Sequence, residues 1–166
     1  MLNKIRGAGA VIPARPALKN ILLAGLGGFI AIAALALLDR NLAYTLILGS
    51  FGASCVLVFG FPAAPFSQPR NVVAGHFLSS LVGLLCLHFL GGEWWSLAHA
   101  VGLAISLMML TRTVHPPAGS NPVIVFLAAP TWEFLIFPTL IGALVIVLVS
   151  LVYNNVSHKD NYPQYW

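Results

Sequence analysis

The sequence predicts an all-α membrane protein: a polytopic transmembrane helix bundle of five to six segments, with one or two broken or half-helices. Three observations predict this fold. The 166 residues are 59% hydrophobic and 7% charged, with a mean hydropathy of +0.92, far from an ordinary soluble domain. The apolar residues fall in runs of about 20, the length that spans a bilayer. Glycine, serine or proline interrupts two of these runs.

The first half of the chain predicts three membrane elements. A basic segment, residues 1–19, comes first, and its lysines and arginines favour a cytoplasmic N-terminus. We expect a helix over each of the runs that follow: Asn20–Leu38, Leu42–Phe61 and Val72–Leu90. The second run carries Gly49-Ser-Phe-Gly-Ala-Ser54, where we expect a break or a kink. A proline-rich loop, residues 62–71, precedes the third.

The second half predicts a helix, a half-helix and a helix. Trp95–Leu110 is followed by Thr111-Arg-Thr-Val-His-Pro-Pro-Ala-Gly-Ser-Asn121. Because Pro116 and Pro117 cannot continue a helix, the first helix must stop near Thr113, and a second can start at Pro117. Residues 117–129 reach only about 20 Å, too short for a bilayer core of about 30 Å. A last helix is expected over Trp132–Tyr153.

The chain therefore divides into a basic N-terminal segment, residues 1–19, a transmembrane domain, residues 20–153, and a polar tail, residues 154–166. If every segment crosses, Arg70, Arg112 and Lys159 all return to the cytoplasmic side. Gly52-Ala-Ser54 and Ala118-Gly-Ser120 are followed by similar residues, and this pattern is compatible with an inverted repeat of three plus three elements. Inverted repeats with interrupted helices are typical of transporters.

Several function classes find little support. The four carboxylates, Asp39, Glu93, Glu133 and Asp160, lie at segment ends or in the tail, which disfavours a cation site at the bilayer centre. No spacing of cysteine and histidine is typical of a metal site, so no cofactor is expected. No serine, histidine and aspartate grouping indicates nucleophilic catalysis, and we expect no enzyme. The scattered basic residues give no support to nucleic-acid binding.

The candidate substrate-binding residues lie beside the two interruptions and at the start of the third run. Helix N-termini with small residues present free N–H groups to anions, arginine suits oxyanions, and histidine can donate or carry a proton. Pro116 and Pro117 open the backbone between the helix that precedes them and the helix that follows them. The set comprises Gly52, Ala53, Ser54, Arg70, Asn71, His76, Arg112, His115, Gly119, Ser120 and Asn121. Helix packing and topology anchoring are the alternative roles for the glycines and arginines. For His115 the alternative is a structural role that only holds the broken backbone in place.

Three segments resemble the HPP family of integral membrane proteins: Ser50–Phe59, Ser67–His76 and Thr111–Asn121, the last with His115-Pro116-Pro117 itself. The resemblance extends over most of Asn20–Tyr153. It implies a transport role, because members have been linked to nitrite transport, notably across chloroplast membranes. Some members carry an added soluble regulatory domain, and only about a dozen residues follow Tyr153 here.

We therefore expect a channel or carrier for a small inorganic anion in the cell inner membrane, with nitrite as the expected substrate. Its partners would be the lipid bilayer and the anion. The sequence leaves the oligomeric state open, and a homo-oligomer is compatible with it. A channel for small neutral solutes or protonated weak acids is the first alternative. A membrane-embedded subunit or enzyme is the second.

Overall fold

The computed structural model describes residues 10–42 and 45–166, and every regular element within these ranges is helical. The α-helices are α1 (Leu18–Asn41), α2 (Gly49–Gly60), α3 (Pro69–Leu90), α4 (Trp94–Leu110), α5 (Asn121–Ala128) and α6 (Ile141–Ser157). Shorter turns of helix are η2 (Pro65–Ser67), η3 (Pro116–Ser120), η4 (Trp132–Leu135) and η5 (Ile136–Leu140). The all-α class is thus confirmed for the described residues.

Three helical stretches are long and apolar enough to cross a membrane: α1 with 24 residues, α3 with 22, and Trp132–Ser157 with 26, which joins η4, η5 and α6 across a kink at Phe137. The helices α4, α2 and α5 have 17, 12 and 8 residues. The two shorter helices fall below the range of about 17–25 residues for a membrane span, and α4 lies at its lower limit. The number of crossings and the inverted repeat therefore stay predictions, as does the cytoplasmic N-terminus; residues 1–9, with Lys4 and Arg6, lie outside the described residues.

The interruption of the second run lies before α2 and not within it. Residues 45–48 have no regular secondary structure, and α2 then runs unbroken from Gly49 to Gly60. The predicted break inside residues 49–54 is wrong, because glycine and serine at these positions are accommodated in a helix that neighbours pack against. The glycine at position 49 instead opens the helix after an extended Leu48.

The opening around the paired prolines is longer than predicted. The helix α4 ends at Leu110, about one turn before Thr113, and Arg112 takes a left-handed conformation with φ 57°. After an extended His115, the chain forms the 3-10 turn η3, and α5 begins only at Asn121. The α-helix predicted from Pro117 therefore starts one turn later, because Pro116–Ser120 form a 3-10 turn, which is a frequent lead-in to the N-terminus of an α-helix.

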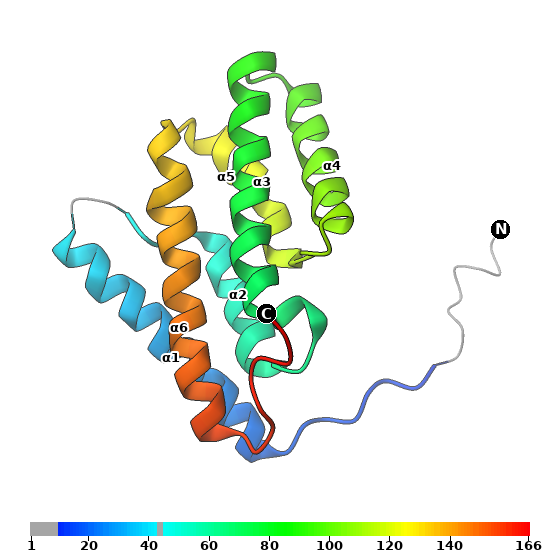
Figure 1. Cartoon of the computed structure of the whole chain (residues 1–166), viewed down its shortest axis with the longest axis vertical. Helices are drawn as coiled ribbons and strands as arrows, with labels where there is room; N and C mark the ends of the chain where they lie inside the picture. Colours follow the sequence, from blue (N-terminus) through cyan, green and yellow to red (C-terminus); the bar gives the residue numbers. More distant parts are fainter. Residues whose placement is uncertain (1–9, 43–44) are drawn as a thin grey trace.

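The bundle is arranged around α3 and α2 (Figure 1). Helices α4 and α5 pack against α3, whereas α1 packs against α2 and α6. The core between these groups contains fully buried side chains from several elements, among them Leu35, Phe51, Phe59, Val125 and Ile146. α2 also contacts η3, so part of the opened segment, residues 111–120, lies inside the bundle, although Arg112, Pro116 and Ser120 remain exposed.

The C-terminal residues fold back onto the connection between α2 and α3 (Figure 1). Tyr162 is buried, and its hydroxyl donates to the Ser67 carbonyl at 2.7 Å. The Gln164 N–H donates to Gln68 Oε1 at 2.8 Å. The tail, predicted as a polar segment separate from the membrane domain, is thus partly packed against residues 62–68.

Candidate functional site

One face of α3 holds the opened segment in place. Asn71 Nδ2 donates to the Val114 carbonyl at 2.9 Å, and two turns later Ser79 Oγ donates to the Ala118 carbonyl at 2.6 Å. Gly75 lies between them on the same face, since residues four apart are neighbours on a helix. A Cβ at Gly75 would lie 2.8 Å from His115 Cβ, so the absent side chain lets the segment approach closely. These contacts satisfy carbonyls that the broken helix leaves free.

Four polar side chains meet where α2, α3 and the opened segment come together. Ser54 Oγ lies 2.9 Å from His76 Nε2 and 2.8 Å from His115 Nε2. On the other side of the His76 ring, Asn121 Nδ2 lies 3.1 Å from Nδ1. All four side chains have 0% exposed surface. We call Ser54, His76, His115 and Asn121 the histidine cluster.

Further hydrogen bonds extend the histidine cluster at both ends. His115 Nδ1 lies 2.7 Å from the Phe66 carbonyl oxygen in the connection between α2 and α3. At the other end, Asn121 Nδ2 donates to Ser80 Oγ at 2.8 Å, and Ser80 Oγ lies 3.1 Å from Thr139 Oγ1 in η5. The cluster therefore belongs to a continuous polar chain that runs through an otherwise apolar core.

Aromatic contacts fix the orientation of the two rings. His76 packs edge-to-face against Phe51, with ring centroids 5.0 Å apart, and the two histidine rings are also 5.0 Å apart. Such a packed setting restricts each ring to one orientation and thus preserves the hydrogen-bond partners. A solute could reach the cluster only after the surrounding helices move, because none of its side chains touches solvent.

The small residues of the two interruptions do not join the histidine cluster. Gly52 and Ala53 are exposed on α2, and space for a Cβ at Gly52 is open. The free N–H groups of α2 belong to the first turn, which precedes Gly52. Gly119 is half-buried, and the exposed Ser120 donates its hydroxyl to the Pro117 carbonyl at 2.8 Å.

The paired prolines differ in their environment: Pro117 is buried and Pro116 is exposed.

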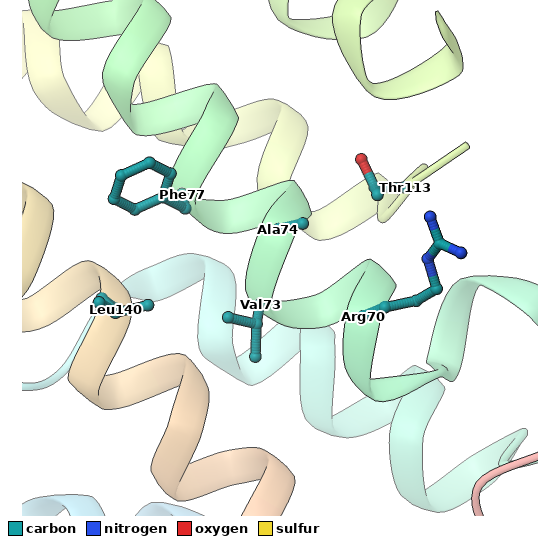
Figure 2. A pocket seen from close by; sticks show the side chains of 6 residues that line it. All are labelled: Arg70, Val73, Ala74, Phe77, Thr113 and Leu140. Atoms are coloured by element: carbon teal, nitrogen blue, oxygen red, sulfur yellow. The ribbon is translucent and has the colours of Figure 1, made fainter. Parts of the chain in front are cut away.

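The two candidate arginines lie outside the cluster as well. Both Arg70 and Arg112 are exposed, and Arg70 Nη2 donates to the Thr111 carbonyl at 3.4 Å. Figure 2 shows Arg70 and Thr113 at one end of an open hollow of about 500 Å³, with Phe77 and Leu140 at the other. The lining is almost entirely apolar and includes no residue of the histidine cluster. An apolar hollow of this kind suits a lipid chain better than an anion.

Four contributing positions were not predicted from the sequence. Ser79 holds the opened segment, Ser80 and Thr139 extend the polar chain, and Gly75 allows the close approach of His115. A serine four residues after His76 on the same helical face was a usable signal for Ser80. Thr139 carried no such signal, because its place depends on how η5 packs against α3.

His76 and His115 are the titratable side chains of the polar chain that runs from the Phe66 carbonyl to Thr139. With both rings neutral, the histidine cluster offers uncharged hydrogen-bond donors and acceptors. Among the described residues, no lysine, arginine, aspartate or glutamate is buried. The same residues include no group of three or more His, Cys, Asp or Glu placed to hold a metal. Buried polar groups inside membrane helices are costly and usually functional, so the cluster is the candidate site.

Comparison with known proteins supports the family assignment. The sequence model of one family, described as the HPP transmembrane region, matches residues 13–163. Two transmembrane proteins of Dictyostelium discoideum are 38% and 37% identical to this chain over 93% of its length. The chain covers 58% and 53% of these two relatives. No solved structure matches the chain. A match that includes all three motifs and every helix of the bundle places this chain in the HPP family of transmembrane proteins.

Proposed function

We propose that the chain transports a small inorganic anion across the membrane, and that nitrite is its substrate. The observation that carries this proposal is the fully buried histidine cluster, held where a broken helix enters the bundle. In a membrane, irregular backbone is tolerated where it is buried in protein or lines a pathway. Transporters of other folds bind their solutes at such interrupted helices.

The residues of the cluster suit a small oxyanion. Ser54 and Asn121 supply hydroxyl and amide donors, and each histidine can supply one N–H donor. Nitrite offers oxygen and nitrogen acceptors of matching size, and the resemblance to nitrite-linked family members agrees with this choice. Arg70 and Arg112, although outside the cluster, would raise the local concentration of anions at one mouth of the pathway.

A channel for neutral solutes or protonated weak acids is the second candidate, and one observation favours it. No described lysine or arginine is buried beside the cluster, so an anion entering alone would meet no fixed positive charge. Burying an unpaired charge is expensive. A neutral solute such as glycerol avoids that cost.

The test is solute uptake into liposomes that contain the purified chain, with nitrite, nitrate, chloride and glycerol measured in parallel. We expect saturable nitrite uptake that falls about tenfold in His115→Ala, because a buried site that loses a hydrogen-bonding group loses about 1–3 kcal/mol. His99→Ala is the matched control, since His99 is exposed and bonds only the Trp95 carbonyl. Glycerol uptake equal to that of nitrite would favour the neutral-solute channel.

A further inference from the structure

The hydrogen-bond partners of the histidine cluster define which ring nitrogens carry protons. The Phe66 carbonyl can only accept, so His115 Nδ1 is the N–H donor of that bond. Asn121 Nδ2 also donates to the His76 carbonyl at 3.3 Å, another pure acceptor, which fixes the amide nitrogen toward His76. Of the two hydrogens on Nδ2, one points to Ser80 Oγ and the other is shared between the His76 carbonyl and His76 Nδ1, so Nδ1 is an acceptor and carries no proton. A neutral His76 then has its proton on Nε2, and a neutral His115 has Nε2 free.

Ser54 completes a directed chain between the two rings. His76 Nε2–H donates to Ser54 Oγ, and the single Ser54 hydroxyl hydrogen donates to His115 Nε2. The Ser50 carbonyl, at 3.1 Å, is a longer alternative acceptor for that hydrogen. Donation to His115 satisfies a ring nitrogen that otherwise lacks a donor. The hydrogen bonds thus all run in one direction. Each group donates to the next, from Asn121 through His76, Ser54 and His115 to the Phe66 carbonyl.

One buried atom is left without a partner in this arrangement. Asn121 Oδ1 is inaccessible to solvent and has no hydrogen-bond partner among the described residues. Unpaired buried acceptors are rare and call for an explanation. If the amide turns over, Oδ1 faces His76 Nδ1 and can accept from a protonated nitrogen there.

We propose that Ser54 relays a proton between His76 and His115, so that the chain carries one proton together with each anion. This inference rests on the proposed anion transport and specifies its coupling. A protonated histidine supplies the positive charge that the buried site otherwise lacks. Anion and proton then cross as a neutral pair, and the cost of burying a lone charge is avoided.

The relay balances in protons and charge. A proton binds His76 Nδ1 while the Asn121 amide turns its oxygen toward it, and His76 becomes an imidazolium. The Nε2–H bond of His76 then breaks as an O–H bond forms on Ser54. In the same step the original O–H bond of Ser54 breaks and an N–H bond forms at His115 Nε2. His76 is neutral again and the charge is on His115. The Phe66 carbonyl only accepts a hydrogen bond, so the Nδ1 proton of His115 passes to water beside the exposed Phe66 when the surrounding helices open, and His115 becomes neutral.

Among the described residues, no other titratable side chain has a hydrogen bond or ring contact with this relay: Tyr153 on α6 donates to the Leu23 carbonyl, and Tyr162 and Tyr165 of the tail donate to the carbonyls of Ser67 and Pro65. On α2, Cys55 lies against Gly28 of α1, and on α3, Cys86 packs with Ala100 and Ala104 of α4. The two arginines, Arg70 on α3 and Arg112 before η3, are exposed. η2, α5, η5 and α6 contribute no charged side chain. The proton-binding groups of the site are therefore His76 and His115.

The experiment measures nitrite and protons together. Proteoliposomes with a trapped pH dye receive a nitrite gradient while potassium and valinomycin clamp the membrane potential, and protein-free liposomes report passage of nitrous acid through lipid. We expect the lumen to acidify by one proton for each nitrite taken up, at a rate that the potential does not change. In Ser54→Ala the coupled uptake falls about tenfold, because the relay loses its middle group. Ser54→Thr, which keeps the hydroxyl, retains the coupling.

Ser50→Ala is the matched control. Ser50 lies one turn before Ser54 on the same helix, is also buried, with 3% of its surface exposed, and its hydroxyl has no partner among the described residues. Nitrite uptake that follows the potential and leaves the lumen pH unchanged would overturn the relay and leave the transport proposal standing. Coupled uptake that persists in a folded Ser54→Ala would overturn the role of Ser54. An absence of protein-dependent nitrite uptake would overturn the transport proposal, and the coupling with it.

Discussion

Two short helices, α2 and α5, each bring one polar side chain to the same histidine, but from different positions along the helix. Ser54 comes from the second turn of α2, and Asn121 is the first residue of α5. Both are fully buried. The two interrupted segments therefore serve the site through side chains, and the free N–H groups of their first turns are not what the histidines contact.

The sequence similarity between these segments pairs Ser54 with Ser120, and their environments are opposite. Ser54 contacts both histidines, whereas Ser120 is exposed and bonds only the Pro117 carbonyl. A shared Gly, Ala and Ser composition thus indicates tolerance of small residues near a helix start. It does not indicate equivalent contacts, because a shift of one residue rotates a side chain by about 100° around a helix.

The largest expected effect distinguishes two neighbouring residues: Asn121, the first residue of α5, and Ser120, the last residue of η3. Asn121→Ala removes the donor to His76 and Ser80 and should lower nitrite uptake about tenfold. Ser120→Ala removes only a local bond on the exposed side and should leave uptake within about twofold. Uptake in liposomes at equal protein density is the measurement. A larger loss of uptake in Ser120→Ala would indicate that the start of α5 itself contributes to anion binding.

A second comparison concerns two glycines: Gly75, on the face of α3 that contacts the opened segment, and Gly52, on the exposed face of α2. Gly75→Ala forces a Cβ to within 2.8 Å of His115 Cβ and 3.1 Å of the Thr113 carbonyl, and overpacking of this kind costs about 1–3 kcal/mol. Gly52→Ala meets nothing within 4 Å and should be neutral or stabilising by up to about 1 kcal/mol. Thermal unfolding in detergent measures both. Equal midpoints would mean that the opened segment does not rest on α3 as described.

The tail offers a smaller effect. Tyr162→Phe removes a buried hydroxyl that bonds the Ser67 carbonyl and Ser150 Oγ, and should cost about 1 kcal/mol. Burial raises the pKa of the Tyr162 phenol, so the hydroxyl remains a donor over the usual pH range. Tyr165→Phe is the control, since Tyr165 is 42% exposed and should lose only a few tenths of a kcal/mol. Unfolding midpoints that rank the two variants in reverse would contradict the packing of the tail.

The smallest effect concerns the exposed arginines. Arg70→Gln and Arg112→Gln should each lower nitrite uptake about two- to threefold at low ionic strength, with the difference disappearing at high salt. The salt dependence is the measurement that matters, because a surface charge acts at a distance and is screened. A loss that persists at high salt would mean that an arginine enters the site.

The sequence by itself determined the class of fold, the approximate segments and the opening at His115-Pro116-Pro117. These follow from local chemistry: apolar runs of span length partition into lipid, and paired prolines end a helix wherever they occur. It also singled out Ser54, His76, His115 and Asn121, because polar side chains beside an interruption are unusual in a membrane segment.

Only the tertiary structure decided which of the candidates meet. Ser54 and His115 are 61 residues apart, and their contact depends on how α2 packs against η3. The same packing leaves Gly52, Ala53 and Ser120 outside the cluster and both arginines at the surface. Thr139 joins the polar chain only because η5 lies against α3. Contacts between distant segments depend on the rotation of each helix about its axis, and that rotation is fixed by the packing of the whole core.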